Sequence, residues 1–170
     1  FSEDALNVLK EKKNIRVISI KKFKKTPIPF LIQAIDGGFL VQEDDWKIID
    51  KDNLEFVTDR MPTDDQITDL LFAWKVCKYV KSNAIIFAKN QRTIGIGAGQ
   101  MSRVNSAKIA SLKAAAANLD TKDSVMASDG FFPFSDSIEM ASNNGISCII
   151  QPGGSIKDNE VIEEANTHNI

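Results

Sequence analysis

The stretch AIIFAKNQRTIGIGAGQMSRVNSAKIASLKAAAANL, residues 84–119, decides the fold of most of this chain. It opens with the apolar run AIIFA, reverses at the polar turn of residues 89–92 and returns as a second strand over 93–97. Ser102 then stands where a helix N-cap belongs, ahead of an alanine-rich helix predicted over 103–118. A β-hairpin that leads directly into a helix indicates an α/β fold.

Downstream of residue 119, short apolar runs alternate with amphipathic stretches. Strands are predicted over 124–127 and 147–151, and helices over 136–144 and 157–168. Because strands separated by helices usually pair in parallel through right-handed crossovers, we expect parallel pairing of these later strands. The region therefore predicts a three-layer α/β/α lobe with a mixed sheet, in an element order that resembles the cytidine-deaminase-like architecture.

The earlier part of the chain predicts shorter elements and one long helix. The short elements are a helix over 3–12 behind the cap Ser2, strands over 14–20, 31–35, 39–42 and 53–58, and a basic loop, exposed or facing a ligand, over 21–29. A broad apolar face predicts a buried helix over 63–80. We therefore expect the end of a first lobe in residues 1–61, a connecting helix in 62–81, and a second lobe, truncated at its C-terminus, in 82–170.

The composition of the chain argues against several classes of function. The chain has 170 residues and a net charge of -2, so its overall charge gives no reason to expect a nucleic-acid or membrane partner. Its cysteines, Cys77 and Cys148, both lie in apolar runs, which predicts buried thiols and a reducing, cytoplasmic compartment. The single histidine, His168, argues against a zinc site built from His and Cys.

A glycine-rich loop, GIGAGQMSR over residues 95–103, ends one predicted strand and begins a helix. Glycines allow close backbone approach, and the free N–H groups of a helix N-terminus favour an anion or a carbonyl oxygen. Arg103 adds a planar set of donors. The alternative is a tight structural turn with Arg103 in a surface ion pair. The spacing matches neither a P-loop nor a GxGxxG fingerprint.

Polar and aromatic residues mark three more connections. Asn83 lies in a plain turn or presents its amide to a ligand. The aromatic residues of DGFFPFSD, residues 129–136, either pack beneath the lobe or line a flat pocket for a planar ring. Asp136 is a helix N-cap or a carboxylate that accepts from paired N–H donors. QPGGS over 151–155 again follows a strand, so we expect the loops 95–103, 129–136 and 151–155 to meet at one edge of the sheet.

Four blocks resemble the AICAR transformylase family, the formyl-transfer domain of the bifunctional enzymes that also have IMP cyclohydrolase activity. They are LLFAWKVCKYVKSNAIIFAKN, TIGIGAGQMSR, SDGFFPFSD and IIQPGGSIKDNEVI, with DALNVLKEKKNIRVI and GGFLVQ as weaker matches near the start. The resemblance covers nearly the whole chain. It implies transfer of a formyl group from 10-formyltetrahydrofolate to the amine of AICAR in de novo purine biosynthesis, giving the formylated product that the cyclohydrolase closes to IMP.

The resemblance also implies roles for single residues. Asn83, Arg103 and Phe131 would contact AICAR and orient its amine. Folate contacts would come from Pro133, Phe134, Asp136 and Ser155. Asp129 would help to hold a structural monovalent cation such as potassium, and the sites would be shared between the subunits of a homodimer.

The chain also departs from the family pattern. It has neither the Lys-His pair of a KHxNPCG-type segment nor the final strand with an RxFRH-type ending, so the resemblance implies that this chain alone is inactive. Two alternatives stay open: a module that binds nucleotide or folate without turnover, and a zinc-dependent deaminase suggested by element order. The deaminase zinc signature, HxE or CxE paired with PCxxC, is absent from the sequence.

Overall fold

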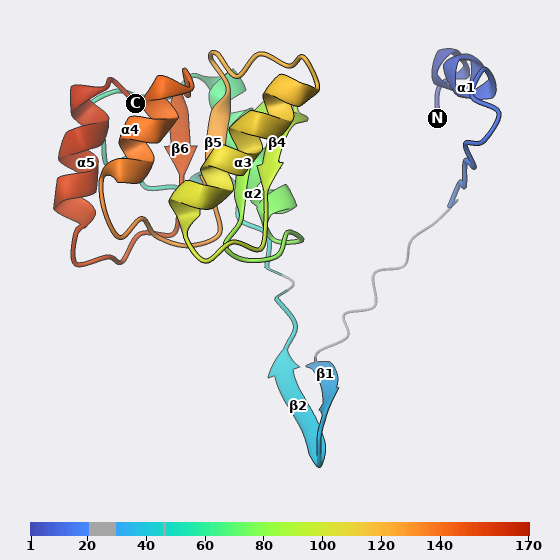
Figure 1. The fold of residues 1–170 in the computed structure, drawn as a ribbon, viewed down its shortest axis with the longest axis horizontal. Helices are drawn as coiled ribbons and strands as arrows, with labels where there is room; N and C mark the ends of the chain where they lie inside the picture. Colours follow the sequence, from blue (N-terminus) through green and yellow to red (C-terminus); the bar gives the residue numbers. More distant parts are fainter. Residues whose placement is uncertain (21–29, 46) are drawn as a thin grey trace. The chain divides into compact units, whose positions relative to one another are not determined.

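A computed structural model describes residues 1–20, 30–45 and 47–170 (Figure 1). The chain forms two compact units, Phe1–Lys47 and Ile48–Ile170, which are described separately. The predicted basic loop over 21–29 lies outside the described residues. No described helix is long and apolar enough to cross a membrane.

The first unit contains a helix and a hairpin. Helix α1 (Glu3–Lys10) begins behind Ser2, whose hydroxyl accepts a hydrogen bond from the Ala5 N–H. Strands β1 (Phe30–Ile35) and β2 (Gly38–Glu43) pair antiparallel, as their turn residues predict. The strand predicted over 14–20 is wrong, since these residues form no regular element; an alternating run becomes a strand only where another strand supplies its hydrogen bonds.

The second unit is built on a four-stranded sheet in the order β4-β3-β5-β6. The strands are β3 (Ile85–Lys89), β4 (Arg92–Gly97), β5 (Val125–Ser128) and β6 (Cys148–Ile150). Strand β3 is antiparallel to both β4 and β5, and only β5 and β6 are parallel. The sheet is therefore mixed, as expected, and the parallel pairing expected of the later strands is confirmed for β5 and β6. The hairpin reverses the chain before it crosses to β5, so β5 runs in the direction of β4 and opposite to its neighbour β3.

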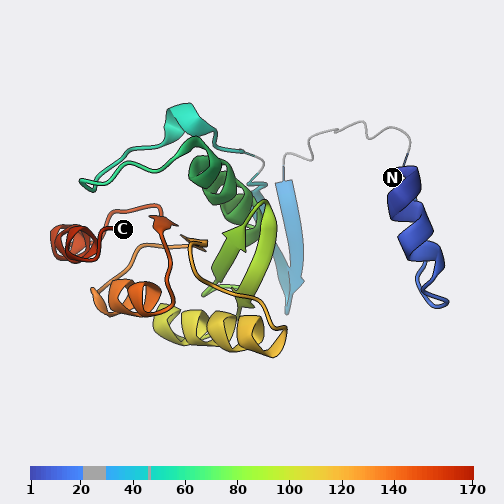
Figure 2. The same cartoon turned by 90° about the horizontal axis from the view of Figure 1, so that it is seen from above.

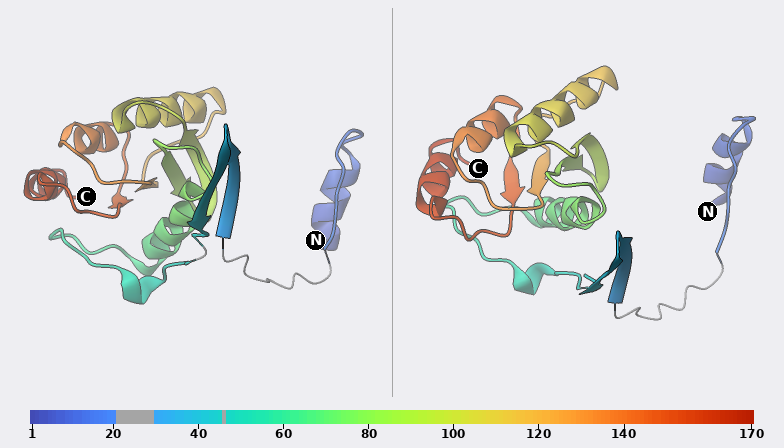
Figure 3. Two further views of the ribbon diagram at one scale, coloured as in Figure 1. Left: turned by 90° about the horizontal axis from the view of Figure 1, so that it is seen from below. Right: turned by 60° about the horizontal axis from the view of Figure 1, so that its bottom comes forward.

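Helices cover both faces of this sheet, which confirms the three layers (Figures 2 and 3). Helix α2 (Asp64–Cys77) packs on one face, where Leu70, Ala73 and Cys77 join a core with Ile86 and Ala127. The second core includes Ile85, Phe87 and Met126 from the strands and residues of the three later helices. Those helices are α3 (Arg103–Ala116), α4 (Asp136–Asn143) and α5 (Asp158–Thr167).

Residues 48–81 contain a short 3-10 helix and the long helix α2. The predicted edge strand over 53–58 is wrong: Asn53 ends a short 3-10 helix, η1 (Lys51–Asn53), which is capped by Asp50, and residues 54–58 form no strand. Helix α2 is a layer of the larger unit, because it packs against β3, β5 and β6. The lobe limits at 61/62 and 81/82 stay predictions about a larger architecture.

Candidate functional site

Three loops meet at one edge of the sheet in the larger unit. Strands β4, β5 and β6 all run toward this edge, and β3 starts from it, because β3 is antiparallel to β4 and β5 while β6 is parallel to β5. Hydrogen bonds link the neighbouring loops, including one of 2.8 Å from the Phe132 N–H to the Gln151 side-chain oxygen. The predicted clustering of loops 95–103, 129–136 and 151–155 is therefore confirmed.

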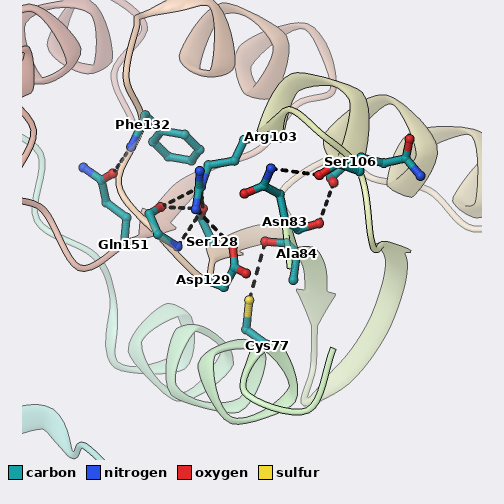
Figure 4. A network of polar contacts seen from close by, with 11 residues as sticks. Cys77, Asn83, Ala84, Arg103, Ser106, Ser128, Asp129, Phe132 and Gln151 are labelled. Carbon is teal, nitrogen blue, oxygen red and sulfur yellow. Dashed lines mark hydrogen bonds and ion pairs between the residues drawn. The ribbon is translucent and has the colours of Figure 1, made fainter. Parts of the chain in front are cut away.

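Arg103 connects the β4–α3 loop with the end of β5 (Figure 4). Its Nε donates to Ser128 Oγ at 3.2 Å and to the Gly130 carbonyl at 3.1 Å. Its Nη2 lies 3.4 Å from Oδ1 of Asp129, and both side chains are largely buried, with 20% and 17% exposed. The surface ion pair that the sequence left open is thus excluded. Arg103 lies at the first position of α3, partly shielded from solvent, where its charge is screened less than on the surface.

Asn83 lies at the start of β3, beside Arg103 (Figure 4). Its side-chain Nδ2 and its backbone N–H both donate to the Gln100 carbonyl, at 2.8 and 3.2 Å. Its own carbonyl accepts a 2.7 Å hydrogen bond from the buried Ser106 hydroxyl. These three bonds hold the amide in one orientation, and no described residue bonds its Oδ1. The oxygen of Asn83 therefore remains available to a donor on a ligand.

The alternating glycines have a different role from the predicted anion-binding loop. A Cβ on Gly97 would lie 1.7 Å from the Ser106 carbonyl oxygen, and one on Gly95 would lie 2.2 Å from that of Ala110. Both glycines therefore let α3 pack directly on β4, which is a structural role. Only Gly99, with φ +67, belongs to the connecting loop itself.

The aromatic residues of the loop after β5 fit both alternatives that the sequence left open, since one packs beneath the lobe and two are exposed. Phe132 is fully buried in the core, whereas Phe131 and Phe134 are 43% and 60% exposed. Pro133 is half-buried. In the loop 95–103, Met101 is also 94% exposed. Exposed aromatic faces at this edge suit a planar ligand or a second protein surface.

Asp136 is exposed and is the first residue of α4. Its interpretation as the N-cap is wrong: Ser135 occupies that position and makes no side-chain capping bond. The carboxylate of Asp136 therefore lies at a helix N-terminus without a capping task, where the helix dipole favours its charge.

The third loop contains Ser155 and an acidic residue that the sequence did not single out. Ser155 Oγ accepts a 3.1 Å bond from the Lys157 N–H. Asp158 accepts a 2.7 Å bond from the Gly154 N–H through Oδ2, while its Oδ1 is buried without a partner. This side chain also lines an open cavity of about 610 Å³ beside β6. The sequence signal for Asp158 was an acidic residue in the first turn of a helix that follows a glycine pair. Acidic residues are common at helix starts, so this signal does not distinguish Asp158 from other residues.

Asp129 forms an ion pair, and the described residues do not surround it with further acidic ligands. Its Oδ1 faces the Arg103 guanidinium, and no described group of three or more His, Cys, Asp or Glu side chains is arranged to hold a metal. This arrangement fits an ion pair better than a cation site, so its cation role stays a prediction. Burial, followed by the charge of Asp129, raises the pKa of the nearby Cys77 thiol to about 12, which makes it an unreactive core thiol.

The groups at this edge of the sheet can bind a ligand and orient it. It presents a guanidinium, an amide oxygen, two exposed aromatic rings and a carboxylate, on connecting segments or at helix starts next to the strands. Sequence reasoning missed the residues behind them, Ser106, Ser128, Gly130 and Gln151, because small and amide residues carry no distinctive pattern. His168 is engaged elsewhere, between Ser142 Oγ at 3.0 Å and Glu164 Oε1 at 2.8 Å.

A comparison with protein families matches residues 1–113 to the AICARFT/IMPCHase bienzyme family. The match includes Asn83 and Arg103, while the loops 129–136 and 151–155 follow the matched span. This family of formyltransferase/cyclohydrolase enzymes has a role in purine biosynthesis. Since the match covers more than half of the chain, this protein belongs to the AICARFT/IMPCHase bienzyme family.

Proposed function

We propose that this chain supplies the substrate-binding part of a formyl-transfer site, which takes AICAR and 10-formyltetrahydrofolate. The observation that carries the proposal is the pairing of Arg103 and Asn83 at adjacent strand ends, each held by protein contacts on one side. A guanidinium and an amide oxygen match a carboxamide, which has one acceptor oxygen and paired N–H donors. Their fixed geometry would orient the weakly nucleophilic amine, which is catalysis by positioning.

The folate is proposed to bind toward the second and third loops. Phe134 and Pro133 would form a wall for a flat pterin, and Phe131 would face the nucleotide. The Asp136 carboxylate would accept from the paired N–H donors of the aminopyrimidine edge, and Ser155 would contact the same ligand. A homodimer would complete these sites, which is consistent with exposed apolar side chains on the loops, such as Phe134 and Met101.

We further propose that the 170-residue chain binds these ligands without turning them over. Formyl transfer needs a group that takes a proton from the attacking amine. The only histidine is held between α4 and α5 by Ser142 and Glu164, so it is not a candidate at the strand edge. The proton-transfer pair that the family resemblance implies would come from another segment. Location in the cytoplasm remains part of this proposal.

Binding measured by calorimetry tests the nucleotide assignment. Arg103→Ala should weaken AICAR binding on the order of tenfold or more, because a charge-assisted hydrogen bond is lost. The control is Arg92→Ala, since Arg92 is exposed at the start of β4, at the opposite edge of the sheet. Equal AICAR affinity for the two variants would refute the assignment, as would absence of AICAR binding to the unchanged chain.

A second variant tests the folate assignment. Asp136→Asn should weaken binding of 10-formyltetrahydrofolate and leave AICAR affinity unchanged. Glu139→Gln is its matched control, because Glu139 is also exposed and acidic in the first turn of α4. A formyl-transfer assay on the same samples separates enzyme from binding module: turnover by the chain alone would contradict the proposal that it only binds.

A further inference from the structure

We propose that Ser128 and Gly130 are positioning residues, which fix the Arg103 guanidinium in the orientation that receives the ligand. The nature of that ligand rests on the proposed function, whereas the positioning itself rests on the contacts around the guanidinium. Both residues lie in the block SDGFFPFSD, but the family resemblance implies no role for either of them.

Ser128 is the last residue of β5 and is fully buried. Its hydroxyl donates a 2.7 Å hydrogen bond to the Gly130 carbonyl, which closes a tight turn. The Ser128 oxygen and the Gly130 carbonyl then both accept from Arg103 Nε, at 3.2 and 3.1 Å. The turn therefore presents two acceptors to one N–H, and the hydroxyl orients the second acceptor as well as serving as the first.

Gly130 provides the space that the guanidinium occupies. A Cβ on this residue would lie 2.0 Å from Arg103 Nη2 and 2.8 Å from Cζ. Any other residue here would push the guanidinium away from the turn, unless the backbone moved. The guanidinium packs on the face of the glycine while its Nε bonds to the carbonyl of that same residue.

These contacts occupy one side of the guanidinium and leave the other side without a hydrogen-bond partner among the described residues. Nε bonds to the turn and Nη2 lies near Asp129, while Nη1 has no hydrogen-bond partner among the described residues. Because the guanidinium is planar, fixing Nε fixes the direction of the remaining N–H groups. Ordering the side chain before the ligand arrives removes part of the entropic cost of binding. Ser128 thus acts on the ligand through Arg103.

The Arg103 Nε–H gives a readout that does not depend on any ligand. In the unchanged chain, NMR should show this proton exchanging with solvent more slowly than those of exposed arginines such as Arg92. Ser128→Ala removes one acceptor and frees the other, so exchange should become faster by on the order of fivefold to tenfold. Ser124→Ala is the matched control, because Ser124 is equally buried beside β5 and bonds a backbone oxygen, that of Thr121, at 2.6 Å.

Gly130→Ala tests the same inference from the other side of the guanidinium. It should also speed Nε–H exchange, with no need to remove a hydroxyl from the core. Unchanged exchange in both Ser128→Ala and Gly130→Ala, in protein whose amide spectrum shows the native fold, would overturn the inference. An equal acceleration in Ser124→Ala would overturn it too, because the effect would then be general loosening of β5.

The effect on ligand binding is tested by calorimetry with AICAR and, separately, with 10-formyltetrahydrofolate. Ser128→Ala should weaken AICAR binding by on the order of fivefold and leave folate affinity unchanged. Faster exchange without weaker AICAR binding would overturn the claim that positioning serves the ligand. If the unchanged chain binds no AICAR although exchange responds as expected, the proposed function fails and the positioning of Arg103 stands.

Discussion

The β4–α3 and β6–α5 connections have similar sequences, GAGQMSR and PGGSIKD, and different environments. In the first, Ser102 caps α3 by accepting from the Asn105 N–H, and the Gln100 carbonyl accepts twice from Asn83. In the second, the residue before α5 makes no side-chain capping bond, and Asp158 keeps a buried oxygen without a partner. A strand, a glycine pair and a serine therefore do not specify one kind of site.

The difference follows from what lies next to each connection. The β4–α3 loop lies beside β3 and the end of β5, so Asn83 and Ser128 can bond to it. The β6–α5 connection also follows an edge strand, as β4–α3 does, but the neighbouring loop bonds to it only at Gln151, through the Phe132 N–H. Its later residues bond within the connection and its own helix, since Gly154 donates to Asp158 and Lys157 donates to Ser155. The two connections therefore differ in how many neighbouring elements bond to them.

The largest expected effect concerns the glycines. Gly97→Ala should lower the free energy of unfolding by about 3 kcal/mol or more, since its Cβ would meet the Ser106 backbone oxygen at 1.7 Å. Gly153→Ala should cost about 1 kcal/mol, because its φ of +66 disfavours a Cβ although the nearest atom is 3.6 Å away. Urea denaturation of both variants checks this. Equal losses would show that the β4–α3 connection is no more tightly packed than the other.

The next effect concerns the two buried cysteines, Cys77 and Cys148. Burial and then Asp129 raise the pKa of Cys77 from 9.0 to about 12, opposed by Arg103. Between these values the folded protein keeps the proton that the unfolded chain releases, so stability falls as pH rises, by about 1.4 kcal/mol per pH unit. Cys77→Ala should remove that part of the slope above pH 9.0.

Cys148→Ala provides the comparison for this pH dependence. Burial raises the pKa of Cys148 as well, but Arg60 and Ser147 oppose the shift. We expect a smaller change of slope than for Cys77→Ala, in urea titrations repeated from pH 8 to pH 10. A slope that neither substitution alters would mean that the thiols are solvated in the folded protein.

The smallest effects concern helix starts. Ser102→Ala should destabilise the protein by about 1 kcal/mol, because the Asn105 N–H loses its acceptor. Asp158→Asn should change stability by less than about 0.5 kcal/mol, since the amide oxygen can still accept from Gly154 and an unpartnered charge is removed. Thermal unfolding of both variants provides the measurement. A loss on Asp158→Asn as large as that on Ser102→Ala would show that α5 is capped through this carboxylate.

Local sequence signals predicted the elements that are stabilised within themselves. The capped helices α1 and α3, the β1–β2 hairpin and all of the strands of the larger sheet lie close to their expected positions. The strands predicted over 14–20 and 53–58 failed, because a strand needs a neighbour that the pattern of one segment cannot supply. Asp69 was missed for a related reason: it accepts from the Asn90 and Gln91 N–H groups, across a fold contact that no local pattern marks.

The candidate site shows the same division. Position after a strand was enough to bring three loops to one edge, and the residues chosen there include Arg103 and Asn83. The sequence could not assign the glycines, since Gly95 and Gly97 look like a ligand loop until α3 is placed on β4. Nor could it find Ser128, whose role depends on a guanidinium that comes from 25 residues earlier in the chain.

The sequence by itself determined the α/β class, the order of elements from α2 onward, the caps of α1 and α3 and the resemblance to the family, because these depend on local periodicity, capping residues and motifs in a fixed order. Only the tertiary structure decided that β5 runs antiparallel to β3, that two glycines serve packing, and which atoms hold Arg103 and Asn83. The physical reason is that strand pairing, close approach and hydrogen-bond partners join residues far apart in the chain, and their energies exist only once those residues are brought together.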